Sequence, residues 1–96
     1  MMDQPDQALQ DFCRQHHVRR LSLFGSRLKG THRFDSDVDL LVEFEAGHAP
    51  SMFGLVRMEA QLSALMGQKV DLRTPGDLSR YFRQDIIDSA KVLHAA

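Results

Sequence analysis

The sequence has few of the features that mark secreted, membrane-spanning or nucleic-acid-binding proteins. Its single cysteine, Cys13, cannot form an internal disulfide, so nothing points to secretion. No apolar run approaches the ~20 residues of a membrane-spanning helix, and the acidic, polar N-terminus does not resemble a signal peptide. The net charge of −1 gives no general attraction to nucleic acid or to anionic membranes. We therefore expect a cytoplasmic protein.

Histidine-based metal motifs are missing as well. The five histidines form no HxH, HExxH or Cys/His pattern, so the sequence does not predict a structural zinc site. No internal repeat or low-complexity tract interrupts the chain. A length of 96 residues suffices for one small core, so we expect a single domain over residues 1–96.

What the sequence does contain is an alternation of helical and strand-like patterns. The second strand-like run is apolar on both faces beyond Asp39, which predicts a central strand. Ser51 is placed to cap a long helix that Gly67 ends. The expected helices cover about 5–17, 51–66 and 74–90, the last one with a possible break, and the expected strands cover 18–24, 38–44, 69–73 and 92–94. The predicted fold class is α/β, with a single small mixed β-sheet and flanking helices.

The stretch 21–42, LSLFGSRLKGTHRFDSDVDLLV, holds a candidate phosphate site. Gly25 lets a ligand approach the backbone, and Ser26 is a good N-cap for a short helix whose free N–H groups would face an anion. Arg27 and Lys29 place positive charge within one turn of the same point. We expect Gly25, Ser26 and Arg27 to bind the phosphates of a nucleotide.

Asp37 and Asp39 open the next strand and form a candidate metal site. Because they are two residues apart on a strand, both side chains project from one face. Two such carboxylates repel each other unless a cation lies between them, and oxygen ligands suit Mg²⁺ or Mn²⁺. Mg²⁺ is usually held by one or two carboxylates together with substrate phosphates, which fits the neighbouring phosphate site.

Asp71 is an acid in the middle of a short strand, which is locally unfavourable. If that strand pairs beside the Asp37–Asp39 strand, Asp71 completes a triad that can hold two metals ~4 Å apart. Asp71 would then bind the second metal or act as base toward an attacking hydroxyl. The expected reaction is in-line displacement at the α-phosphate with release of pyrophosphate. Alternatively, Asp71 simply pairs with Lys69 or Arg73.

The joint pattern is more specific than its parts. A lone DxD is often a solvated turn, and a lone Gly-Ser pair is common. At residue frequencies of roughly 5–7% each, a chance match to Gly25, Ser26, Asp37 and Asp39 together is about one in a thousand for a chain this short. The combination therefore favours a functional site.

These residues resemble a known signature. GSRLKGTHRFDSDVDLLVEF resembles the GSx10DxD signature of the DNA polymerase β-like nucleotidyltransferase superfamily. With KVDLRTPGDL downstream, the chain resembles a minimal nucleotidyltransferase of the MntA-like type. The resemblance implies a polymerase β-like nucleotidyltransferase fold, with Gly25 and Ser26 at the nucleotide phosphates, Asp37 and Asp39 as metal ligands and Asp71 as the third acid.

The resemblance also implies a partner and a reaction. In this family the partner is a HEPN-domain toxin, and AMP passes from ATP to a tyrosine of the toxin in a Mg²⁺-dependent reaction that makes the nucleotidyltransferase an antitoxin. About 25 residues follow Asp71, so we expect the acceptor surface to come from another protein. The competing hypothesis is a non-catalytic antitoxin that masks its partner. A third, less favoured, is transfer to a small molecule or an RNA end.

Several other side chains receive simpler interpretations. Glu43 and Glu45 are expected to be solvated rather than metal ligands. Met52 and Phe53 are expected in the core, with a partner contact as the alternative. Arg83 is expected on the exposed side of the last helix.

Overall fold

The computed structural model describes residues 4–25 and 37–95, with side chains from residue 7 onward. Over these residues the elements are, in order, α1 (Gln4–Gln15), β1 (Val18–Phe24), β2 (Val38–Phe44), α3 (Met52–Met66), β3 (Val70–Arg73), the 3-10 helix η1 (Pro75–Asp77), α4 (Arg83–Ser89) and β4 (Lys91–Ala95). The short helix predicted after Ser26 lies outside the described residues. None of the described helices is long and apolar enough to cross a membrane.

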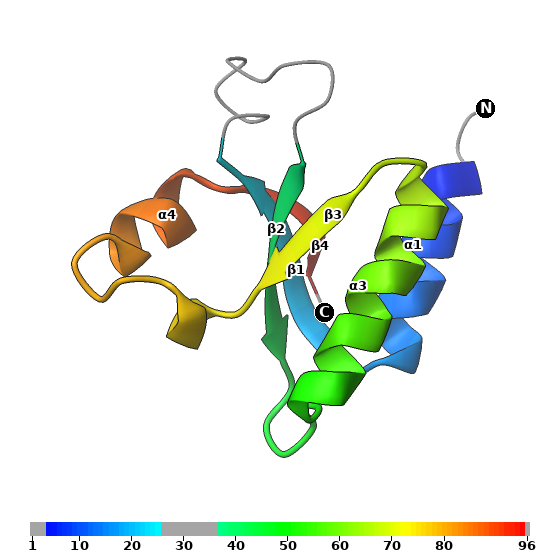
Figure 1. Cartoon of the computed structure of the whole chain (residues 1–96), viewed down its shortest axis with the longest axis horizontal. Helices are drawn as coiled ribbons and strands as arrows, with labels where there is room; N and C mark the ends of the chain where they lie inside the picture. Colours follow the sequence, from blue (N-terminus) through cyan, green and yellow to red (C-terminus); the bar gives the residue numbers. More distant parts are fainter. Residues whose placement is uncertain (1–3, 26–36, 96) are drawn as a thin grey trace.

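The strands form one mixed sheet with the order β3-β2-β1-β4. β2 pairs in parallel with β3 and antiparallel with β1, and β1 pairs antiparallel with β4. β2 therefore has a neighbour on each side, which confirms its prediction as a central strand. Figure 1 shows α1 and α3 together against one face of this sheet, with α4 on the opposite side.

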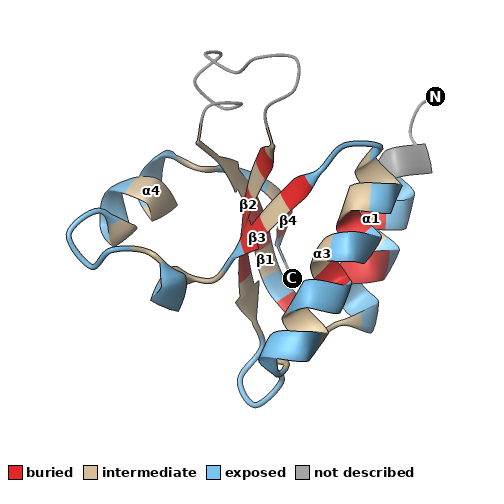
Figure 2. Cartoon of the chain, viewed as in Figure 1, coloured by how far each residue is buried: buried red, intermediate tan, exposed pale blue. Residues whose placement is uncertain are grey.

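The main core lies between the sheet and the α1–α3 layer. Leu40 and Val42 of β2 are fully buried there against residues such as Leu62 of α3, and Figure 2 shows this buried band along the strands and helices. Cys13 is buried in the same cluster, as predicted, and burial raises the pKa of its thiol to about 11. The thiol is therefore protonated at neutral pH, which makes it a poor nucleophile. Alternation along β2 leaves Asp39 to face the other side of the sheet.

The ends of α3 agree with the sequence. The Ser51 hydroxyl accepts a hydrogen bond from the Gly54 N–H at 3.2 Å, and Gly67 ends the helix in the left-handed conformation at φ 69°. The prediction that Met52 and Phe53 belong to the core is wrong: their side chains are 79% and 82% exposed. They occupy the first turn of α3, where the helix has not yet met the sheet.

The segment after β3 is less helical than expected. Thr74 and Asp77 form the predicted capping interaction, with the Asp77 carboxylate 3.1 Å from the Thr74 N–H, but it supports only the single turn of η1. The predicted exposed position of Arg83 is also wrong. Its side chain is half-buried, and its guanidinium donates to the carbonyls of Pro75 (2.7 Å) and Leu78 (3.1 Å).

Candidate active site

Asp39 and Asp71 lie side by side on neighbouring strands. The parallel register of β2 and β3 pairs these two residues directly, so the condition on which the sequence hypothesis of a triad depended is met. Their neighbours Val38, Leu40, Val70 and Leu72 are buried in the main core. Because side chains alternate along a strand, both aspartates face the opposite side of the sheet. Asp37 precedes Asp39 by two residues and shares that side.

The electrostatic environment of this group disfavours its own negative charge. Partial burial and then the negative charges of Asp71 and Asp37 raise the pKa of Asp39, and the positive charge of Arg73 offsets part of that effect. Like charges held close together gain most from a bound cation. The donor atoms are all carboxylate oxygens, which is the set that Mg²⁺ and Mn²⁺ prefer. The residues present therefore fit a hard divalent ion.

Two basic side chains approach the acids. Arg73 makes a double contact with Asp71, from Nε to Oδ1 at 3.1 Å and from Nη2 to Oδ2 at 3.0 Å. Lys69 Nζ lies 4.0 Å from Oδ2 of Asp37, whose side chain is 41% exposed. Asp71 thus pairs with Arg73 and also lies beside Asp39, so both alternatives from the sequence hold at once. An exposed ion pair of this kind contributes only about 0–1 kcal/mol, so exchanging it for a metal contact costs little.

The acids do not yet form a closed cage. Among the described residues, the metal-ligating trio whose donor atoms all lie within 4.8 Å of one another is His17, Glu45 and His48, rather than the three aspartates. Both oxygens of Asp71 are at the same time in contact with Arg73.

Gly25 lies directly against Asp39. It follows β1, whose last residue Phe24 is the register partner of Asp39 across the β1–β2 pair. A Cβ added to Gly25 would overlap Oδ2 of Asp39 and lie 3.0 Å from its Cγ, and the backbone adopts φ +83°. Glycine is required here both for the left-handed backbone and for the space it leaves to the carboxylate. Ser26 and Arg27, like Lys29, lie outside the described residues.

Two residues that the sequence reasoning missed hold β3 in place. β3 is an edge strand, and its outward N–H groups need partners. The Val70 N–H donates to Ser63 Oγ at 2.9 Å, and the Leu72 N–H donates to Glu59 Oε2 at 2.7 Å. These two bonds flank Asp71 and tie its strand to α3. No spacing in the sequence indicated this role, because α3 carries other polar residues as well.

Glu43 corrects another expectation. It was predicted to be solvated, but its side chain is only 16% exposed and pairs with Arg20, its register partner on β1. Arg20 Nε lies 2.7 Å from Oε2 and Nη2 lies 3.0 Å from Oε1. Glu43 is therefore held in an ion pair with Arg20 rather than free in solvent.

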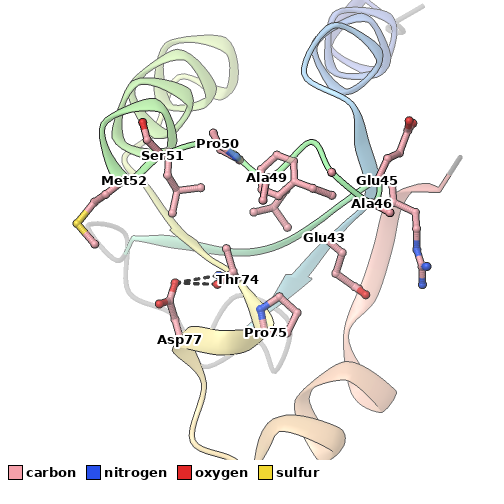
Figure 3. A pocket seen from close by; sticks show the side chains of 15 residues that line it. Glu43, Glu45, Ala46, Ala49, Pro50, Ser51, Met52, Thr74, Pro75 and Asp77 are labelled. Carbon is pink, nitrogen blue, oxygen red and sulfur yellow. Dashed lines mark hydrogen bonds between the residues drawn. The ribbon is translucent and has the colours of Figure 1, made fainter.

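A pocket of about 650 Å³ lies at the other end of β2 (Figure 3). Its walls come from the end of β2, the connection to α3, the first turn of α3, and the segment from Thr74 to Asp77. None of the three aspartates lines it. Glu43, which does, is four residues beyond Asp39, roughly 13 Å along a strand. The pocket is therefore separate from the acidic group.

Comparison with known proteins identifies the family. A model of the nucleotidyltransferase domain matches residues 5–93. A proposed protein adenylyltransferase of Methanocaldococcus jannaschii is 35% identical over 75 residues, which cover 78% of each chain. The protein adenylyltransferase MntA of Thermococcus cleftensis is 46% identical over 55 residues, covering 57% of this chain and 54% of that relative.

Solved structures support the same family assignment. The structure of a proposed minimal nucleotidyltransferase is 33% identical, with a TM-score of 0.72 and coverage of 88% of this chain and 85% of the other. A toxin–antitoxin complex with AMP-PNP contains a chain of the same fold, with a TM-score of 0.75 at 20% identity and coverage of 95% and 73%. The protein belongs to the nucleotidyltransferase domain family and, within it, to the minimal nucleotidyltransferases.

Proposed function

We propose that this protein transfers AMP from ATP to a protein acceptor, and that the acceptor is a HEPN-type toxin which it neutralises as an antitoxin. The observation that carries the catalytic part is the placement of Asp39 opposite Asp71 and against Gly25, with a pKa raised by partial burial and by the neighbouring acids. Matched relatives are named as protein adenylyltransferases. A solved complex of the same fold, at 17% identity and a TM-score of 0.69, pairs an MNT antitoxin with a tri-AMPylated HEPN toxin of Shewanella oneidensis.

We assign the metal to the carboxylates. Asp37, Asp39 and Asp71 would hold Mg²⁺, with two ions as the expected number and Mn²⁺ as a substitute. Such ions, when bound, neutralise the triphosphate and acidify the attacking hydroxyl. Gly25 leaves space for a phosphate beside Asp39, and Ser26 and Arg27 are proposed as phosphate-binding residues on the basis of the sequence signature.

The chain's own acids position the reacting groups. Asp71 is proposed to accept the proton of the acceptor hydroxyl once its exposed double contact with Arg73 has been exchanged. The acceptor oxygen then forms a bond to the α-phosphorus of ATP as the bond from that phosphorus to pyrophosphate breaks. Asp39 must be ionised for this arrangement, so its raised pKa sets an acidic limit to activity.

The decisive experiment combines the protein, labelled ATP, Mg²⁺ and the candidate toxin. The double variant Asp37→Asn/Asp39→Asn should reduce label on the toxin by roughly 10²–10³-fold or more, because it removes the charge that stabilises the transition state. The control is Asp11→Asn, an exposed aspartate of α1 on the other side of the molecule. If the double variant leaves labelling and neutralisation unchanged, the catalytic hypothesis is wrong.

A masking antitoxin is the second candidate. The exposed apolar side chains Met52, Phe53 and Val56 along α3 favour it, because such residues are typical of protein contacts. The same experiment separates the two candidates. A double variant that no longer labels the toxin but still neutralises it would establish masking.

A further inference from the structure

A second group of metal-ligating side chains, His17, Glu45 and His48, lies at the end of the β1–β2 pair that is remote from the aspartates. His17 immediately precedes β1, and Glu45 immediately follows β2. The register pairs Val18 with Phe44, which brings His17 and Glu45 together across the two strands. His48 follows three residues after Glu45. The group is therefore assembled by strand pairing from positions that are far apart in the sequence.

The main chain fixes the positions of these three residues. The Glu45 N–H donates to the His17 carbonyl at 3.0 Å, and the His48 N–H donates to the Glu45 carbonyl at 3.0 Å. His17 adopts a left-handed backbone with φ 57°, and Gly47 adopts φ 82° in the turn that returns His48 toward Glu45. These conformations direct three separate side chains to one point, while the side chains themselves remain exposed.

The donor atoms are already close. The His17 and His48 rings stack with centroids 4.0 Å apart at 20°, and His17 Nδ1 lies 3.9 Å from Glu45 Oε1. Donor atoms of all three side chains lie within 4.8 Å of one another. Two ligands of one Zn²⁺ ion, each about 2.0–2.2 Å from the metal, are about 3.3–3.6 Å apart in a tetrahedral site. The donor atoms would have to approach by up to about 1.5 Å, and the stacked rings would have to turn so that both nitrogen lone pairs point at the ion, which exposed side chains can do.

We propose that His17, Glu45 and His48 bind one Zn²⁺ ion, with water in the remaining position, at a site distinct from the aspartates. Two imidazoles and one carboxylate form a known zinc ligand set with an open position, and imidazole nitrogen favours zinc-like ions over Mg²⁺. The ion clamps the turn before β1 to the turn after β2. Because Glu45 and Gly47 also line the pocket of Figure 3, the clamp fixes one wall of that pocket.

The test uses the full chain carrying Asp37→Asn/Asp39→Asn, so that the aspartates do not contribute. Titration with Zn²⁺, and with Co²⁺ followed by its visible absorption, should give one ion per chain. His17→Asn, which tolerates the left-handed backbone, and His48→Ala should each weaken binding by about 10–100-fold. His16→Gln, the adjacent histidine outside the group, should leave binding unchanged. Mg²⁺ in large excess should not compete.

Thermal unfolding supplies a second readout. Zn²⁺ should raise the melting temperature of the chain, because a ligand that binds only the folded state stabilises it, and this rise should vanish in His48→Ala. Circular dichroism without metal checks that each variant is folded, and Glu45→Gln replaces any histidine variant that is not. No saturable binding at one ion per chain, or unchanged binding in both histidine variants, would overturn the proposal.

Discussion

The two ends of the β1–β2 strand pair make an informative contrast. At one end Asp39, with Asp71 and Asp37, offers only carboxylate oxygens, and partial burial together with the charges of Asp71 and Asp37 raises the pKa of Asp39. At the other end His17, Glu45 and His48 offer two imidazoles and one carboxylate at an exposed turn. A hard cation would relieve the repulsion among the carboxylates at the acidic end. One pair of strands thus presents two ligand sets that suit different metals.

Two glycine substitutions test this contrast most strongly. Gly25 lies at the aspartate end and Gly47 at the histidine end, and both have a left-handed backbone. Gly25→Ala should overlap the Asp39 carboxylate and lower AMP transfer by about 10²-fold, since a displacement of about 1 Å at a catalytic group has an effect of that size. Gly47 has nearly the same φ, but a Cβ there meets nothing within 4 Å. Gly47→Ala should therefore lose about 1 kcal/mol of stability and leave transfer unchanged. Equal loss of transfer in both variants would contradict the contact with Asp39 as the cause.

The second prediction concerns the hydrogen bond by which Glu59 of α3 holds β3, the strand that carries Asp71. Glu59→Ala removes the acceptor of the Leu72 N–H beside Asp71 and should lower the free energy of unfolding by about 1–3 kcal/mol. Glu59→Gln keeps an acceptor oxygen and should lose less. Chemical denaturation of the two variants measures this difference. A loss as large for Glu59→Gln as for Glu59→Ala would show that the charge of Glu59, rather than its hydrogen bond, stabilises β3.

The third prediction uses pH to separate the ends. Metal at the aspartates requires ionised Asp39, whose pKa in the folded protein is raised. Mn²⁺ affinity should therefore begin to fall at a higher pH than for an ordinary carboxylate, by about tenfold per pH unit once Asp39 is protonated. Titrations across a pH series in the His48→Ala background measure the aspartate end alone. If Mn²⁺ affinity stays constant down to the pH at which ordinary carboxylates are protonated, the pKa of Asp39 is not raised.

The smallest effect is on stability without metal. Because the folded-state pKa of Asp39 is raised, the folded protein holds its proton more tightly than the unfolded chain does, and stability falls as the pH rises through that pKa. Asp39→Asn removes this loss at neutral pH. It should raise the melting temperature while abolishing transfer. Asp11→Asn, at an exposed helix position, serves as the control and should change little.

Much of the fold and part of the site were predictable. The helical spacing over 51–66 with Ser51 and Gly67 at its ends fixed α3, because caps and periodicity act within a few residues. The apolar run after Asp39 correctly placed β2 in the centre of the sheet. Asp37 and Asp39 share a face for the same local reason. These features depend on contacts close in sequence, which a pattern can report.

Other features depend on which strand pairs with which. Glu43 was expected in solvent, yet the register of β1 and β2 sets it opposite Arg20. Met52 and Phe53 were expected in the core, but the path of α3 relative to the sheet leaves its first turn uncovered. No spacing in the chain indicates that a helix side chain such as Glu59 completes the hydrogen bonding of β3.

By itself the sequence determined the order of helices and strands, the common face of Asp37 and Asp39, and a family signature that includes Gly25. Only the tertiary structure decided that Asp71 stands opposite Asp39, that Gly25 leaves room for the Asp39 carboxylate, and that His17 meets Glu45 and His48. The physical reason is that backbone geometry and side-chain alternation are local, whereas strand register joins residues about 14 to 32 positions apart through hydrogen bonds that no short pattern specifies.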